Sequence, residues 1–149
     1  MTSDLRDLYQ EVIFDHYRKP RNCRALIDAN HKAEGYNPLC GDKVTIYLKV
    51  TDGIIEDVAF EGAGCAIATA SASLMTEALK GKKIAEVEHL FHDFHDMVTD
   101  KRTEAPRDLG KLEVLAGVRE FPARVKCATL AWHTLHAALK DRHQPVSTE

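Results

Sequence analysis

The sequence predicts an α+β fold in which helices pack on one face of a small, three-stranded antiparallel sheet. Three observations indicate this fold class. Residues 43–61 have the alternation of two paired strands, residues 66–139 have mainly helical spacing, and the strand signals come before this long helical part. The chain has 149 residues, which suits one domain, so we expect residues 1–149 to form a single unit.

The first helix is expected to begin at Ser3, whose hydroxyl suits an N-cap, and to end at Pro20. Its apolar stripe consists of Leu5, Leu8, Val12 and Ile13. Residues 21–42 contain Asn22, Gly35, Pro38 and Gly41, so we expect a loop there, with one short strand before Pro38.

A β-hairpin is the clearest local prediction. Val44, Ile46, Leu48 and Val50 alternate with polar residues, and Asp52-Gly53 is a strong hairpin-turn pair. Residues 54–61 continue as a second β-rich segment. The pattern indicates one packed face and one face open to solvent.

The rest of the chain is predicted to be mainly helical. Helices are expected over residues 66–80, ended by Gly81, over residues 84–97, over the short segment 112–118, and from Pro122 onward. Residues 100–110 are charged and contain Pro106 and Gly110, which favours a surface excursion.

Composition narrows the function classes. Hydrophobic residues make up 44% and charged residues 29%, as in ordinary globular proteins, and the net charge of −3 disfavours nucleic acid as a partner. No apolar run could span a membrane, and the N-terminus does not resemble a secretory signal, so we expect a cytoplasmic protein with no membrane partner. In that compartment, cysteines favour metal binding or catalysis over disulfides.

Three cysteines stand at positions that can present a thiol. Cys40 lies in a turn-rich loop, Cys65 follows a glycine-rich bend into a helix, and Cys127 lies in the first turns of the last helix. A helix N-terminus favours the thiolate, which is the form that binds metal and attacks sulfur. With Asp42, these cysteines could form a four-coordinate zinc shell or hold an iron–sulfur cluster. Buried cysteines acting as small apolar residues are the alternative, and Cys23, which stands apart, fits that alternative best.

Three motifs in one order resemble the U-type iron–sulfur cluster assembly proteins, which include the IscU and NifU N-terminal types, and they are most similar to the SufU branch. The motifs are Asn37-Pro-x-Cys-Gly-Asp42, Gly62-x-Gly-Cys-Ala-Ile-x-x-Ala-Ser-x-Ser73 and Arg124-Val-Lys-Cys127. The similarity extends from residues 8–17 to residues 128–132, nearly the whole chain.

The resemblance implies the function of iron–sulfur cluster biogenesis and a set of site residues. Cys40, Cys65 and Cys127 match the three sulfur ligands of the family, and Asp42 matches its ligating aspartate. Arg124 matches an arginine typical of the SufU branch, in which the metal is usually Zn²⁺. The implied partners are a SufS-like cysteine desulfurase and downstream SUF scaffold or apo iron–sulfur proteins.

Two features depart from the IscU pattern. Lys126 stands where IscU-type scaffolds have histidine, and residues 99–118 look like the extra stretch of SufU-type chains. Residues 121–126 also replace the chaperone-recognition run of IscU scaffolds, which argues against a dedicated Hsp70-type chaperone partner.

The sequence is compatible with three functions of the site. In a sulfur relay, zinc is bound by the four ligands, and Cys40 accepts the persulfide sulfur, because a cysteine in a loop moves more freely than one on a helix. Arg124 has a supporting role, in which it stabilises the persulfide anion or contacts an acidic partner surface. In a scaffold, the same residues hold a transient [2Fe–2S] cluster, and Asp42 keeps it labile. In a structural site, zinc only stabilises the fold.

Other polar residues receive simpler interpretations. His89, His92 and His95 can share a helix face, as can His133 and His136, and we expect both sets to lie on solvated surfaces. Ser71 and Ser73 are expected to let their helix pack closely against the sheet, because no partner for a nucleophilic serine is evident.

Overall fold

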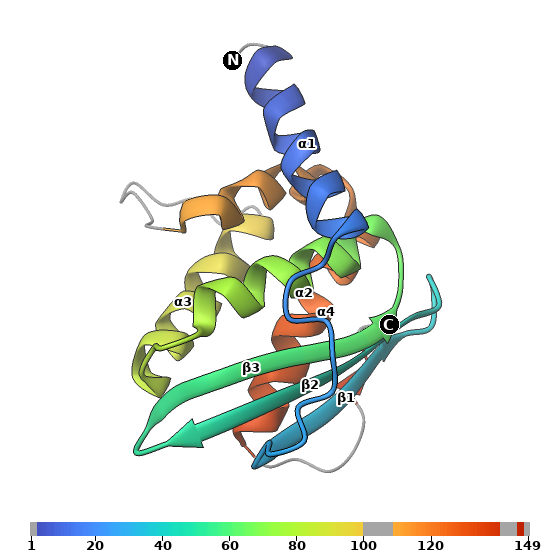
Figure 1. Ribbon diagram of the computed structural model, residues 1–149. Helices are drawn as coiled ribbons and strands as arrows, with labels where there is room; N and C mark the ends of the chain where they lie inside the picture. The colour runs from blue at the N-terminus through green and yellow to red at the C-terminus, as the bar shows by residue number, and fades with distance from the viewer. Residues whose placement is uncertain (1–2, 100–108, 141–145, 148–149) are drawn as a thin grey trace.

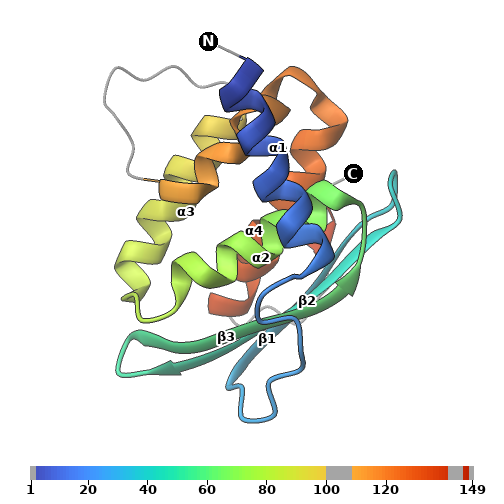
Figure 2. The same ribbon diagram turned by 45° about the horizontal axis from the view of Figure 1, so that its top comes forward.

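A computed structural model describes residues 3–99, 109–140 and 146–147 of the chain. Its elements, in chain order, are α1 (Ser3–Arg18), β1 (His31–Asn37), β2 (Asp42–Thr51), β3 (Ile54–Ala63), α2 (Ala66–Leu79), α3 (Ile84–Val98), the 3₁₀ helix η1 (Gly110–Glu120), α4 (Pro122–Leu139) and β4 (Val146–Ser147). The helices lie together on one side of the sheet (Figures 1 and 2). The predicted α+β fold is therefore confirmed.

The sheet has the strand order β3-β2-β1-β4, and its three long strands are antiparallel neighbours. The Asp52-Gly53 turn joins β2 to β3 as predicted, and a bulge interrupts their register between Lys49 and Val50. The two-residue strand β4 adds to the outer edge, parallel to β1. A strand of two residues has no periodic pattern, which is why the sequence does not predict it.

The core lies between the inner face of the sheet and the helices α2 and α4. Ile46 and Leu48 on β2 are completely buried, as is Trp132 on α4. The Trp132 ring stacks on Phe94 of α3, with ring centroids 4.4 Å apart. The alternation of β2 thus decides which face of the sheet the helices cover.

The segment 21–42 contains more strand than the sequence predicts, since β1 spans seven residues within it. The inward positions of β1 are Ala33, Gly35 and Asn37, none of which is a large apolar residue. A Cβ at Gly35 would lie 2.1 Å from Thr134 Oγ1 of α4, so close approach of the helix requires a small residue here. The usual hydrophobic alternation of a strand is therefore missing.

Two helical predictions also need adjustment. In α1, Val12 and Ile13 pack against the core, but Leu8 is 53% exposed, because the N-terminal part of α1 projects beyond the other helices (Figure 1). The short helix expected at 112–118 is confirmed and is longer. Three of its four buried residues recur every three positions, the repeat of a 3₁₀ helix; these are Leu112, Leu115 and Val118, and the fourth is Val114.

Some predictions fall on residues outside those that the structure describes. These are most of the excursion at 100–110 and the side chains of Ser3 and Leu5 in α1. Leu109, which is described, is buried. Among the described residues, no helix has both the length and the apolar character needed to cross a membrane.

Candidate metal centre

Three segments that are distant in sequence meet at one end of the sheet. Cys40 lies in the turn between β1 and β2, and Asp42 is the first residue of β2. Cys65 caps the N-terminus of α2, and Cys127 lies in the second turn of α4. Three ligand atoms, one from each of Cys40, Asp42 and Cys127, lie within 4.8 Å of one another. The Cys65 Sγ lies 3.8 Å from Asp42 Oδ2.

The turn that carries Cys40 is built around Asn37. The Asn37 carbonyl accepts hydrogen bonds from the N–H groups of Cys40 (3.3 Å) and Gly41 (2.9 Å). Its side-chain Oδ1 accepts another from the N–H of Leu39 at 3.2 Å, a local side-chain-to-backbone bond typical of asparagine in turns. The turn leaves Cys40 exposed, beside Leu39, which is 68% exposed.

Asp42 links the β1–β2 turn to the start of α2. Its buried carboxylate accepts the N–H of Cys65 through Oδ1 at 2.9 Å. The next residue back, Gly64, is so close that an added Cβ would lie 2.9 Å from this Oδ1. The Cys65 Sγ in turn accepts the N–H of Ala68 at 3.4 Å, so this sulfur caps the N-terminus of α2.

Cys127 is the buried sulfur of the site. Its Sγ lies 3.5 Å from the Cys40 Sγ, and the Asn37 Nδ2 donates toward it at 3.8 Å. Burial raises the pKa of the Cys127 thiol, and the nearby Asp42, Cys40 and Cys65 raise it further. Cys127 therefore stays protonated unless a cation lies beside it.

The donor set fits a thiophilic metal. Three sulfurs and one carboxylate match the ligand types of four-coordinate zinc, and thiolates also suit iron–sulfur clusters. Cys40 and Cys65 are exposed whereas Asp42 and Cys127 are buried, so the site faces solvent on one side. Within the part of the chain that the structure describes, no second group of three His, Cys, Asp or Glu side chains is as close.

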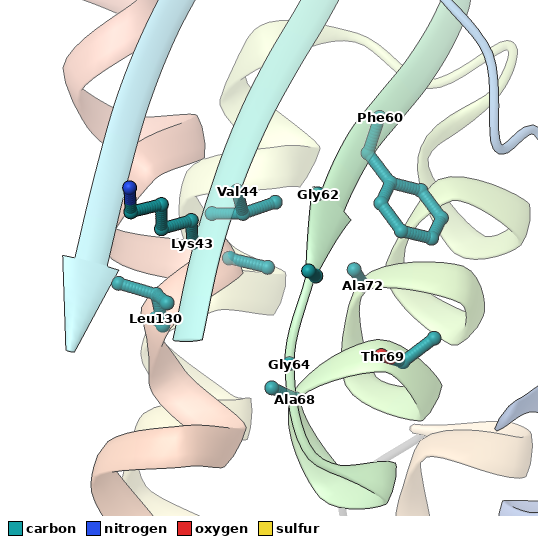
Figure 3. A pocket seen from close by; sticks show the side chains of 11 residues that line it. Lys43, Val44, Phe60, Gly62, Gly64, Ala68, Thr69, Ala72 and Leu130 are labelled. Carbon is teal, nitrogen blue, oxygen red and sulfur yellow. The ribbon is translucent and has the colours of Figure 1, made fainter. Parts of the chain in front are cut away.

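The small pocket behind these residues cannot hold a substrate. It lies between the ends of β2 and β3 and the helices α2 and α4, and Gly62, Gly64, Ala68 and Ala72 are among the residues that line it (Figure 3). Its free volume is about 10 Å³, roughly that of one water molecule. This pocket therefore leaves no room for a substrate, whereas the Cys40 thiol is open to solvent.

Arg124 and Cys23, the remaining predicted residues, make contacts of their own. The guanidinium of Arg124 lies over the Phe121 ring, 4.4 Å from its centroid, at the exposed start of α4. Cys23 is exposed and pairs with Phe60 in an isolated bridge. Its thiol is nevertheless partly desolvated, which raises the pKa of Cys23, and the charge of Glu61 raises it further.

Two of the simpler interpretations are only partly right. His89 and His92 are largely exposed, as expected, but His133 is half-buried and its ring packs edge-on against Phe91. Burial lowers the pKa of His133. Ser71 and Ser73 do not face the sheet. Ser71 Oγ donates to the Ala128 carbonyl on α4, and Ser73 Oγ lies 2.7 Å from His16 Nδ1 on α1.

No role for Asn37 can be predicted from the sequence, although Asn37 is the first residue of the motif at residues 37–42. It is completely buried and contacts two of the cysteine-bearing segments. The one feature of the sequence that singles out Asn37 is its position directly before Pro38, in a turn that contains a cysteine. This feature does not predict the direction of the side-chain amide.

Comparison with known proteins places the chain among iron–sulfur assembly proteins. The family model described as "NifU-like N terminal domain" matches residues 8–147. The zinc-dependent sulfurtransferase SufU of Bacillus subtilis is 44% identical over 133 residues, covering 89% of this chain and 90% of that protein. The iron–sulfur cluster assembly scaffold protein IscU of Streptococcus pyogenes is 42% identical over 138 residues, covering 93% and 86%.

Among solved structures, one from Fervidobacterium islandicum superposes with a TM-score of 0.82. It is 36% identical, covers 87% of this chain and 94% of that chain, and is described as an iron–sulfur cluster assembly scaffold protein for the SUF system.

Proposed function

Since this chain belongs to the family of NifU-like N-terminal domains, we propose that it works in iron–sulfur cluster assembly as a zinc-dependent acceptor of persulfide sulfur. Cys40, Asp42, Cys65 and Cys127 hold the zinc, and a cysteine desulfurase of the SufS type supplies the sulfur. The convergence of Cys40, Asp42 and Cys127 ligand atoms within 4.8 Å is the observation that carries this proposal. The sulfur then passes to a SUF scaffold or to apo iron–sulfur proteins.

The transfer step is a thiol exchange on the outer sulfur of the donor. The Cys40 thiolate attacks the terminal sulfur of a desulfurase Cys–S–SH group, a new S–S bond forms at Cys40, and the original S–S bond breaks to leave the desulfurase thiolate. The persulfide proton travels with the transferred sulfur. Zinc, when bound, supplies the positive charge that keeps the cysteines deprotonated at neutral pH.

Access supports Cys40 as the acceptor. Cys40 is exposed in a turn, whereas Cys127 is buried on α4. Cys65 is also exposed, but it is fixed as the N-cap of α2. Arg124, on the exposed first turn of α4, has a supporting role, in which its positive charge attracts an anionic persulfide or an acidic partner surface.

The test is stimulation of a cysteine desulfurase by the purified protein. Cys40→Ser should fold normally but leave sulfide production at the level of the desulfurase alone, because a hydroxyl cannot accept sulfane sulfur. Cys23→Ser is the matched control, since it also removes an exposed cysteine but one outside the ligand group, and it should stimulate like the wild type. Full stimulation by Cys40→Ser would show that another residue accepts the sulfur.

A scaffold is the second candidate, because relatives at 42% and 39% identity are IscU scaffolds and the donor set also suits a [2Fe–2S] cluster. The resemblance to IscU-type scaffolds implies a histidine where this chain has Lys126, and this departure favours the relay. Anaerobic incubation with iron and sulfide separates the two functions. A stable, coloured cluster that transfers intact supports the scaffold, and retained zinc without a cluster supports the relay.

A further inference from the structure

Asn37 and Asp42 occupy equivalent places at the end of the sheet. They are directly opposite each other in the β1–β2 register, and both side chains are buried. Each accepts a backbone N–H from a segment that carries a cysteine. Asp42 accepts the N–H of Cys65, and Asn37 accepts the N–H of Leu39, next to Cys40. Only Asn37 also has a donor group to offer.

The orientation of the Asn37 amide follows from its contacts. A backbone N–H can only donate, so the atom 3.2 Å from the Leu39 nitrogen must be the amide oxygen. The NH₂ group therefore points the other way, where the Cys127 Sγ lies 3.8 Å from it. Because Asn37 is completely buried, solvent does not offer this donor an alternative acceptor.

We propose that Asn37 is a positioning residue of the metal site, which donates a hydrogen bond to the Cys127 sulfur and at the same time holds the turn that carries Cys40. The inference rests on the proposed function, because it concerns Cys127 as a metal-bound thiolate. A thiol sulfur is a weak acceptor, whereas a thiolate accepts a charge-assisted bond. The bond is therefore strongest in the metal-bound state, and it keeps the two sulfurs, 3.5 Å apart, in a fixed relative position.

Two substitutions distinguish the hydrogen bond that Asn37 donates to Cys127 from its role in the β1–β2 turn. Asn37→Asp keeps the shape and the acceptor for the Leu39 N–H but replaces the donor with an oxygen that repels the Cys127 thiolate. Asn37→Ser keeps a short acceptor for the turn, since serine forms similar local bonds, but cannot reach Cys127. A role limited to the turn predicts little effect on the metal in either variant.

Asn30→Asp is the matched control. Asn30 also uses both ends of its amide, donating to the Val50 carbonyl and accepting the Val50 N–H, each at 2.8 Å. It lies at the opposite end of β1, just before His31. The control therefore loses an amide donor, in this case an exposed one, at the far end of the same strand.

The experiment measures zinc affinity by competition with a chromophoric chelator and the sulfur-to-cobalt charge-transfer band of the Co²⁺-loaded protein. We expect Asn37→Asp and Asn37→Ser to bind zinc roughly 10- to 100-fold more weakly, as is usual when a hydrogen bond to a metal ligand is lost, and to shift the band. Asn30→Asp should match the wild type, and circular dichroism checks that each variant is folded.

The outcomes distinguish the two proposals. If folded Asn37→Asp and Asn37→Ser match the wild type in affinity and band position, the positioning role of Asn37 is wrong and the metal site stands. If the wild type itself gives no thiolate–cobalt band, the metal site is wrong and the inference about Asn37 is overturned with it.

Discussion

At the scale of single residues, Gly64 limits how the Asp42 carboxylate can lie. The carboxylate already accepts the Cys65 N–H, so it cannot rotate away from a new neighbour without losing that bond. Gly64→Ala would place a Cβ 2.9 Å from Asp42 Oδ1, closer than carbon and oxygen normally approach. We expect the displaced carboxylate to weaken zinc binding by roughly 10-fold or more, measured by chelator competition.

Gly117→Ala provides the control for Gly64→Ala. Gly117 lies in η1, and an added Cβ there would have no atom within 4 Å. Alanine at this position should leave zinc affinity unchanged. Equal affinities for the two variants would show that Asp42 is not held against Gly64 in the metal-bound protein.

The predicted site residues and Asn37 show what the sequence can and cannot reveal about a site. Cysteines next to glycine-rich or proline-rich bends are visible as residue types, so a metal site could be predicted before its geometry was known. The close approach of Cys40 to Cys127 depends on how β1 packs on α4, and no local pattern records it. Asparagine is common in turns, and only the fold shows that the Asn37 amide faces a sulfur.

At the scale of elements, the junction of α1 and α2 is held by a buried histidine. His16 Nδ1 lies 2.7 Å from Ser73 Oγ, which also accepts the N–H of Arg21, and His16 Nε2 lies 3.6 Å from Glu77. Burial lowers the pKa of His16, and the Arg21 charge lowers it further, whereas Glu77 opposes the shift. The neutral ring fits these contacts, because its unprotonated Nδ1 can accept a hydrogen bond from the Ser73 hydroxyl group.

The lowered pKa of His16 predicts a pH-dependent stability. Below about pH 6.5, the unfolded state binds a proton that the folded state binds less readily. The contribution of His16 is therefore complete above this pH and is lost as the pH falls toward its folded pKa. Urea unfolding at pH 7.5 and pH 5.5 should show a smaller loss of stability for His16→Gln than for the wild type.

His16→Gln should also cost about 1–3 kcal/mol at pH 7.5, since it disturbs a buried hydrogen bond. His89→Gln is the control, because the His89 side chain is 80% exposed, and it should keep the wild-type pH dependence. An unchanged pH dependence in His16→Gln would assign the effect to other groups, of which the half-buried His133 is the first candidate.

The elements themselves differ in how visible they are in the sequence. The β2–β3 hairpin has large apolar residues at alternate positions, and it was predicted with nearly its observed bounds. In β1, the inward positions hold Ala33, Gly35 and Asn37, so the sequence indicates only a short strand before Pro38, and contact with α4 has removed the pattern that would predict its full length. A strand with alternating large apolar residues can be recognised from its own sequence, whereas a strand whose inward residues are small because a helix packs closely against it cannot.

At the scale of the whole molecule, the proposed metal joins segments that the core also joins. The β1–β2 turn, the start of α2 and the start of α4 meet at the site, while the same elements pack around Ile46, Leu48 and Trp132 farther inside. This core does not include the ligands, so it should persist when the metal is removed. Zinc then stabilises the fold without being required for it.

Removal of zinc tests this separation of core and site. A ligand present at about 100 times its dissociation constant adds about 2.7 kcal/mol to stability, which for a domain of this size raises Tm by roughly 5–10 °C. Chelation should therefore lower Tm by about that amount and leave the far-ultraviolet circular dichroism at 25 °C unchanged. Cys23→Ser should show the same drop as the wild type, because its thiol lies outside the ligand group.

The opposite outcome would favour a structural metal. If chelation abolishes the helical signal at 25 °C, the metal is needed for folding, as in small zinc domains whose binding energy is also their folding energy. Loss of desulfurase stimulation on chelation would then report unfolding and say nothing about Cys40. If the signal persists and zinc restores stimulation, the metal acts on the thiols, and the exposed Cys40 remains the acceptor that the proposed relay requires.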